Sequence, residues 1–215
     1  MIRVLLVDDH RLVRTGLRRV LDDQADFEVV GECDSGEAAI ERARDLIPDV
    51  VLMDINMPGI GGLEATRRIL QRNTEVKIVA VSMHVEEPFP SRILAAGAHG
   101  YVSKDSAPEE VIAAIRKVHR GGHYVASTIA GNLAASFVKG SPSSPFESLS
   151  QREMQVMLML TQGHSTQQIS DKLCLSPKTV STYRYRLFDK LDVCNNVELT
   201  RMALRYGLIE DHAEQ

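Results

Sequence analysis

Residues 49–62 read DVVLMDINMPGIGG, and this stretch decides the fold of the first half of the chain. The run 50–53 is apolar at every position, which is typical of a strand covered on both faces in a parallel sheet. The residues after Asp54 are rich in turn formers and cannot continue the strand. Asp54 is therefore predicted at the carboxyl end of a strand, the edge at which open α/β sheets bind ligands.

Similar strand-like runs recur along residues 1–120, and helical patterns separate them. The alternation predicts a doubly wound, flavodoxin-like parallel sheet of five strands over residues 1–120. The predicted strands are 3–7, 27–31, 50–53, 77–81 and 101–102, and the predicted helices lie near 12–21, 38–46, 63–70, 93–96 and 108–120.

The pattern changes after about residue 120. Residues 121–148 are predicted to be a linker with a helix near 128–138, followed by the Ser- and Pro-rich segment KGSPSSPFES. From 149 to 212 the sequence predicts four helices and no strands, and Ser150 with Glu153 forms a capping-box pattern at the first of them. We expect a second, smaller all-α domain with a helix-turn-helix within 166–191.

Composition limits the classes of protein that the chain can belong to. It has 215 residues, and 25 Lys and Arg against 29 Asp and Glu give a net charge of -4, so a nucleic-acid contact must come from a local patch. Three distant cysteines argue against a disulfide framework and a zinc site. The first apolar run is too short for a signal peptide or a membrane span, so we expect a cytoplasmic protein without membrane contact.

Acidic residues gather at one edge of the predicted sheet. With the strand order 2-1-3-4-5, Asp8 and Asp9 at the end of the first strand lie beside Asp54. Three carboxylates repel each other unless a cation lies among them, and Mg²⁺ prefers such oxygens. Ser82 and Lys104 end the fourth and fifth strands, where they suit phosphoryl oxygens. The pocket predicts in-line phosphoryl transfer onto Asp54.

Each of these residues alone is weak evidence. An acid after a strand is usually a cap or turn residue, a lysine there is usually solvated, and Tyr101, taken by itself, is more often a core residue. The joint appearance of acids, Ser82 and Lys104 at the ends of four strands is far less common by chance. The set therefore favours a functional site.

The motifs of this half resemble the receiver domain of two-component response regulators, over residues 1 to about 120. The resemblance is carried by 7–10 (VDDH), 53–54 (MD), 57–59 (MPG), 81–82 (VS) and Lys104. It implies that a sensor histidine kinase phosphorylates Asp54, and that Asp8, Asp9, Asp54 and the backbone carbonyl of Asn56 hold Mg²⁺.

The same resemblance implies that Ser82, Tyr101 and Lys104 read out the modification. Phosphorylation would draw Ser82 inward and let Tyr101 fill the vacated space. The sequence departs from the receiver pattern at two places. Asp105 stands where many receivers carry proline, and residues 87–90 (EPFP) are an unusual opening to the fourth helix that puts the usual output surface in doubt.

The second helix of the predicted helix-turn-helix has an excess of positive charge. It carries four cations, against Asp189 as its acid, and such a helix fits the major groove of DNA. On charge alone, an ordinary solvated helix face explains the pattern equally well. The predicted DNA contacts are Lys178, Thr179, Ser181, Thr182, Arg184, Tyr185, Arg186 and Lys190.

Residues 146 to about 210 resemble the LuxR-type DNA-binding domain, chiefly through 149–153 (LSQRE), 169–180 (ISDKLCLSPKTV) and 190–191 (KL). A receiver joined to this module is the NarL/FixJ class of response regulator. This class implies a transcription factor that, when phosphorylated, binds promoter double-stranded DNA as a homodimer and meets RNA polymerase there. A closer resemblance over 169–186 implies a hybrid sensor kinase and promoters of small regulatory RNAs as targets.

Two rivals come from other classes of protein. A Mg²⁺-dependent phosphohydrolase of the haloacid dehalogenase type also forms a phospho-aspartate, but it needs an aspartate two positions later, where this chain has Asn56. We therefore expect no enzyme activity beyond the chain's own phosphorylation and dephosphorylation. The other rival is a phosphorylation-gated module that binds RNA or a protein.

Overall fold

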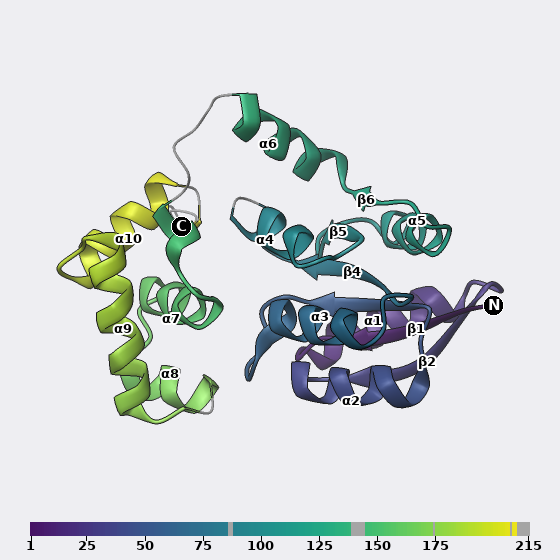
Figure 1. Ribbon diagram of the computed structural model, residues 1–215, viewed down its shortest axis with the longest axis horizontal. Helices are drawn as coiled ribbons and strands as arrows, with labels where there is room; N and C mark the ends of the chain where they lie inside the picture. Colours follow the sequence, from purple (N-terminus) through teal and green to yellow (C-terminus); the bar gives the residue numbers. More distant parts are fainter. Residues whose placement is uncertain (86–87, 139–144, 174, 207, 210–215) are drawn as a thin grey trace. The chain divides into compact units, whose positions relative to one another are not determined.

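The computed structural model describes residues 1–85, 88–138, 145–173, 175–206 and 208–209 (Figure 1). The chain forms two compact units, of which the first contains Met1–Val85 and Phe89–Ala135. The second is built mainly from the helices after residue 136. None of the helices in the described ranges is long and apolar enough to cross a membrane.

The first unit is built on a parallel sheet with the strand order β2-β1-β3-β4-β5-β6. This confirms the doubly wound fold, but the sheet has six strands and the predicted five were one too few. The sixth is two residues long, too short to show a hydrophobic alternation in the sequence. The strands are β1 (Ile2–Val7), β2 (Phe27–Cys33), β3 (Val50–Asp54), β4 (Lys77–Ser82), β5 (Gly100–Ser103) and β6 (Tyr124–Val125).

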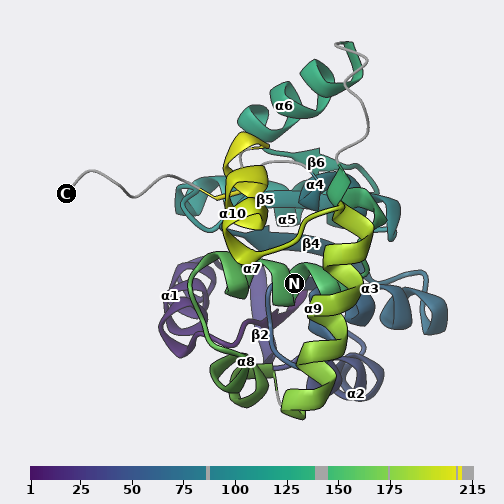
Figure 2. The ribbon, with the colours of Figure 1, turned by 90° about the vertical axis from the view of Figure 1, so that its left-hand side faces the viewer.

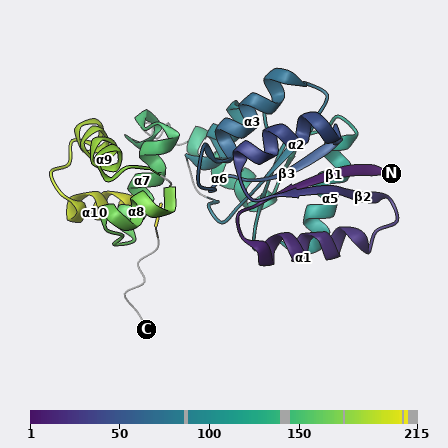
Figure 3. The same ribbon diagram turned by 90° about the horizontal axis from the view of Figure 1, so that it is seen from below.

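Helices cover both faces of this sheet. Figure 3 shows α2 (Gly36–Leu46) and α3 (Gly61–Arg72) on one face, and α1 (Arg11–Asp22) and α5 (Pro108–His119) on the other. The short helix α4 (Phe89–Ala95) adds Ile93 to the core on the side of α2 and α3. It begins earlier than the predicted helix at 93–96, because Pro90 is tolerated in a first turn. Residues 86 and 87 of the unusual opening lie outside the described residues.

The central strand β3 explains why residues 50–53 are all apolar. Val51 and Met53 belong to the core under α2, α3 and α4, whereas Val50 and Leu52 belong to the core under α1 and α5. Every residue of β3 is buried, and residues 50–53 are apolar because both faces of the strand there pack against helices. Asp54 is the last residue of this strand, as the sequence predicted.

The chain beyond α5 begins as part of the first unit. In β6, Val125 pairs with Tyr101 of β5, and the following amide of Ala126 donates to the Tyr101 carbonyl over 3.1 Å. The predicted helix at 128–138 is present as α6 (Ser127–Val138), and Ile129 anchors it in the core with Ala126. Of the Ser- and Pro-rich segment, 139–144 lie outside the described residues and Pro145–Ser148 form a 3-10 helix, η1.

The second unit is all-α, as predicted, and contains α7 (Gln151–Thr161), α8 (Thr166–Leu173), α9 (Pro177–Leu191) and α10 (Asn196–Arg205) (Figure 2). The capping box opens α7: Ser150 Oγ accepts from the Glu153 amide, and Glu153 Oε2 accepts from the Ser150 amide over 2.7 Å. Ser176 caps α9 through the Thr179 amide. The predicted turn at 174–175 lies partly outside the described residues.

Candidate functional site

Asp54 lies at the centre of a buried ionic cluster. Its side chain is 2% exposed, and its Oδ2 accepts a hydrogen bond from Lys104 Nζ over 2.8 Å. Its Oδ1 accepts from the Asn56 amide over 3.1 Å. The same ammonium lies 2.7 Å from Asp8 Oδ2. Lys104 therefore joins the ends of β1 and β3 from the end of β5.

The ionisation of the pair fits a nucleophilic role. Burial raises the pKa of Asp54 to about 6, against the attraction of Lys104, and the charge of Asp8 contributes in the same direction as burial. Burial opposes the charge of Lys104, but the Asp54 and Asp8 carboxylates outweigh this and raise the pKa of Lys104. Asp54 is therefore ionised at neutral pH, and it is protonated in mild acid.

The acids also form a candidate cation site. One ligand atom from each of Asp8, Asp9, His10 and Asp54 lies within 4.8 Å of the others. Asp8 Oδ2 and Asp9 Oδ1 are buried and have no hydrogen-bond partner among the described residues, although Lys104 Nζ and His10 Nδ1 lie within ion-pair distance of them. Carboxylate oxygens of this kind are ligands that Mg²⁺ prefers, so the residues fit the ion. Asn56 contacts Asp54 through its amide, and its carbonyl as a ligand stays a prediction.

Ser82 is the last residue of β4, and Tyr101 is the second residue of the neighbouring strand β5. Ser82 is fully buried, its Oγ accepts from the His84 amide over 3.1 Å, and its carbonyl accepts from the Lys104 amide over 2.9 Å. Tyr101 is fully buried in the core on the side of α4 and α6, and its hydroxyl donates to the His84 carbonyl. Tyr101 thus lies inside the core in this conformation, and its movement on phosphorylation stays a prediction.

Two residues of the cluster were missing from the predicted site. His10 Nδ1 lies 2.9 Å from Asp9 Oδ1, although the histidine side chain is 66% exposed. Arg14 of α1 donates to the Asp8 carbonyl and pairs with Glu32 of β2. The position of His10 next to two acids was a signal in the sequence. Arg14 gave none, because its contacts depend on how α1 crosses the strands.

The predicted DNA contacts lie along one helix, α9. Lys178, Ser181, Thr182, Tyr185 and Arg186 are exposed, whereas Thr179 and Arg184 are half-buried. The Thr182 hydroxyl bonds to the Lys178 carbonyl, one turn earlier in the helix. Val180, Leu187 and Leu191 fill the opposite, buried side of α9, so the exposed face is free of core contacts.

Lys190 differs from the other members of this set. Its ammonium donates to Glu153 Oε2 over 2.7 Å and to the Ser148 carbonyl over 3.1 Å. Glu153 is almost completely buried, and although burial opposes its charge, the hydrogen bonds from Lys190 and Ser150 lower its pKa. Lys190 thus ties α9 to α7 and η1, which does not support the predicted phosphate contact.

Both halves of the chain match family models. Residues 4–116 match the response regulator receiver domain, and residues 147–203 match the bacterial regulatory proteins of the luxR family. The two matches correspond to the two units of the structure, one with the acidic cluster and the other with α8 and α9.

Curated relatives match both units together. The chain is 53% identical over 211 residues to the response regulator GacA of Pseudomonas aeruginosa, covering 98% of this chain and 99% of that protein. It is 53% identical over 209 residues to the response regulator UvrY of Escherichia coli, covering 97% of this chain and 96% of that one.

Solved structures agree with this assignment. RcsB of Salmonella enterica serovar Typhimurium, bound to promoter rprA in the presence of phosphomimetic BeF3−, has a TM-score of 0.64 at 25% identity, covering 94% of this chain and 98% of that one. A LuxR-family two-component response regulator from Aurantimonas has a TM-score of 0.61 at 38% identity, covering 63% of this chain and 97% of that one. The chain therefore belongs to the two-component response regulators that join a receiver domain to a LuxR-type DNA-binding domain.

Proposed function

We propose that the protein is a transcription regulator switched by phosphorylation of Asp54. The observation that supports this most directly is the buried contact of Asp54 with Lys104 beside Asp8 and Asp9. A carboxylate in such a place is desolvated and oriented, two conditions that favour attack on phosphorus. The phosphodonor is a sensor histidine kinase, a hybrid kinase by analogy with GacA and UvrY.

In the proposed step, one Asp54 oxygen attacks phosphorus and the bond between phosphorus and the donor's imidazole nitrogen breaks, with the electron pair leaving on that nitrogen. Lys104 moves from the carboxylate to a phosphoryl oxygen. The move is short, because its ammonium already lies within hydrogen-bond distance of the Asp54 carboxylate that attacks. Ser82, at the end of the adjacent strand, donates to another phosphoryl oxygen. Bound Mg²⁺ would neutralise the carboxylates and the charge that develops on the phosphoryl group.

The output is binding of promoter DNA through α9. Its exposed face offers an ammonium, hydroxyls and a guanidinium, which suit phosphates and base edges in the major groove. A dimer with two such helices binds half-sites about one helical turn apart. By analogy with GacA and UvrY, the targets include promoters of small regulatory RNAs, with RNA polymerase as a neighbour on the DNA, and the protein works in the cytoplasm.

Phosphorylation must shift an equilibrium between weakly and strongly binding forms. A shift from about 1% to about 99% of the active form requires roughly 5 kcal/mol of differential stabilisation. The phosphoryl group and dimeric DNA binding would share this free energy.

The assignment of Asp54 is tested by labelling with acetyl phosphate in the presence of MgCl₂. We expect Asp54→Asn to remove the base-labile label. Asp105→Asn is the control, because Asp105 is exposed and follows Lys104 in the chain, and its replacement should leave labelling unchanged. Continued labelling of the Asp54→Asn variant would reject Asp54 as the acceptor.

The rivals are separated by two further measurements. Turnover of small phosphate esters by the purified protein would favour the phosphohydrolase, which the amide at Asn56 disfavours. Mobility-shift assays with matched duplex DNA and RNA would distinguish a DNA regulator from an RNA-binding module. We expect phosphorylation to strengthen binding to duplex DNA.

A further inference from the structure

We propose that Glu37 of α2 is a positioning residue for the cation site, because its carboxylate holds the loop between β3 and α3 in the conformation that presents Asn56 to Mg²⁺. The inference rests on the function proposed above, in which Mg²⁺ binds among Asp8, Asp9 and Asp54. Glu37 itself contacts neither the acids nor the phosphoryl group in this proposal.

The contact joins the first turn of α2 to the N-terminus of α3. The Ile60 amide donates to Glu37 Oε1 over 2.9 Å. Ile60 is the N-cap residue of the twelve-residue helix α3, and its apolar side chain cannot accept from the first amides of the helix. Glu37 therefore supplies, from α2, an oxygen acceptor for the amide at the N-terminus of α3.

Glycines on both sides of this contact leave room for the close approach of the carboxylate. Gly59 has φ +74°, and a Cβ there would lie 2.5 Å from both carboxylate oxygens of Glu37. On the other side, a Cβ at Gly36 would lie 2.8 Å from Ile60 Cγ1 and 2.9 Å from the Gly61 carbonyl oxygen. A side chain at Gly36 would press on the backbone at Gly61, and one at Gly59 would take the place of the Glu37 carboxylate, so the two glycines keep this approach open.

The other end of the same loop is attached to the phosphoacceptor. The Asn56 amide donates to Asp54 Oδ1 over 3.1 Å, and the Gly62 amide donates to the Ile55 carbonyl over 3.0 Å. The loop is thus fixed at Asp54 and at Glu37, with Asn56 between them. Without the Glu37 contact, part of the loop must be ordered when the cation binds, and this cost lowers the affinity.

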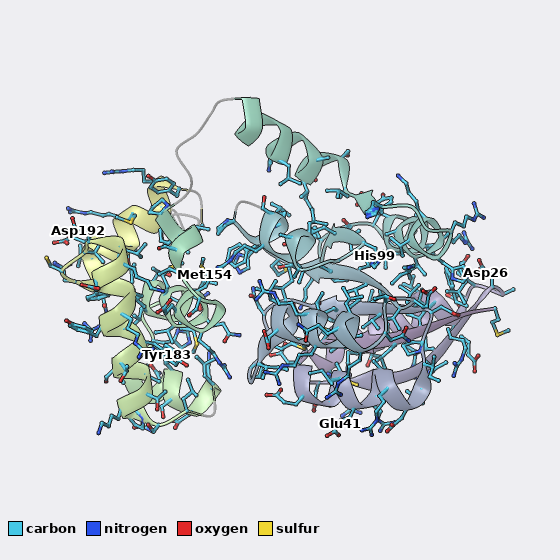
Figure 4. The ribbon with its side chains drawn as sticks, viewed as in Figure 1. Asp26, Glu41, His99, Met154, Tyr183 and Asp192 are labelled. Atoms are coloured by element: carbon cyan, nitrogen blue, oxygen red, sulfur yellow. The ribbon has the colours of Figure 1, made fainter. Side chains whose placement is uncertain are left out.

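The test is a titration of the full chain with MgCl₂, followed on backbone amide NMR signals, without any phosphodonor. Glu37→Ala removes the acceptor, whereas Glu37→Gln removes the charge and keeps an oxygen for the Ile60 amide. Glu41→Ala is the matched control, because Glu41 is an exposed acid one turn later on the same helix (Figure 4).

We expect Glu37→Ala to raise the dissociation constant for Mg²⁺ about fivefold, the factor that corresponds to a helix cap of ordinary strength. It should also shift the Ile60 amide signal before any Mg²⁺ is added. Glu37→Gln and Glu41→Ala should stay within about twofold of the unaltered protein.

Three results would overturn the inference while leaving the proposed function intact. These are an unchanged dissociation constant in Glu37→Ala, an equal loss in Glu37→Ala and Glu41→Ala, which would indicate a general effect of charge, and an equal loss in Glu37→Ala and Glu37→Gln. Failure of the unaltered protein to bind Mg²⁺ would instead reject the proposed cation site and this inference with it. Loss of binding in Asp9→Asn identifies the site in each case.

Discussion

Lys104 and Asp54 form an ion pair in which both side chains are nearly inaccessible to water, with Nζ and Oδ2 2.8 Å apart. Removing one partner from such a pair leaves the other charge buried and uncompensated. Here Asp8 lies 2.7 Å from the same ammonium, so Lys104 keeps a partner when Asp54 changes. Asp54 has no second cation of this kind among the described residues. Two carboxylates therefore compensate the charge of Lys104, whereas one ammonium compensates the charge of Asp54.

The burial of Asp54 beside a single ammonium predicts how the stability of the first unit depends on pH when EDTA removes divalent ions. The pKa of Asp54 rises from 3.8 to about 6 on folding, so the folded protein binds more protons between these values. The free energy of unfolding therefore loses a contribution as pH rises from about 4 to about 6, on the order of 2 to 3 kcal/mol. In Asp54→Asn this loss is absent, so the variant should gain stability relative to the unaltered protein over that range.

The measurement is urea denaturation followed on the amide signals of β3 at several pH values. Taking the difference between the two proteins cancels the carboxyl groups that they share. Asp105→Asn is the control, and its difference from the unaltered protein should stay flat. A flat difference for Asp54→Asn would mean that its pKa is not raised in the folded protein.

Gly62 allows α3 to begin directly against the end of β3. A Cβ at this position would lie 1.9 Å from the Asp54 carbonyl oxygen, so Gly62→Ala must displace the helix or the strand. We expect a loss of at least about 2 kcal/mol in the free energy of unfolding. Gly16 of α1 is the matched control, because a Cβ there meets nothing within 4 Å, and Gly16→Ala should stabilise the unit by about 0.5 to 1 kcal/mol. Equal effects of the two changes would contradict the close approach.

Tyr101 is held by its hydroxyl as well as by its ring. The hydroxyl donates to the His84 carbonyl, so Tyr101→Phe should cost about 1 kcal/mol in urea denaturation, whereas Tyr101→Ala also leaves a cavity and should cost about 3 to 5 kcal/mol. If the two variants were equally stable, the ring would contribute nothing to the core.

The sequence predicted the parts of the site that depend on strand ends. Asp8 and Asp54 directly follow apolar runs and Lys104 lies two residues beyond one, and the carboxyl ends of parallel strands meet at one edge of the sheet. Glu37 could not be found in this way, because its partner Ile60 is 23 residues away on a different helix and nothing in the local pattern connects them. The strand β6 was missed for another reason. It has two residues, too few for a pattern, and only their pairing with β5 distinguishes them from a loop.

The same limit applies to the helical unit. The spacing of apolar residues located the buried side of α9, and the charges located its exposed side. The pattern could not show which cation has an internal partner. Lys178 and Lys190 look equivalent in the sequence, yet Lys190 is paired with the buried Glu153, whereas the Lys178 ammonium has no hydrogen bond or ion pair within the described ranges.

This difference predicts opposite consequences for two lysine substitutions. Lys190→Ala leaves the Glu153 carboxylate buried without its cation. We expect this to destabilise the second unit by about 2 kcal/mol, a moderate loss because the Lys190 side chain is 38% exposed. Faster hydrogen exchange in both α7 and α9 would report this loss. Lys178→Ala should leave exchange unchanged, weaken all duplex DNA sequences alike, and reduce the slope of binding against salt by about one. If Lys190→Ala instead lowered the salt slope and left exchange unchanged, the Glu153 contact would contribute little to stability and Lys190 would be a phosphate contact, as the sequence predicted.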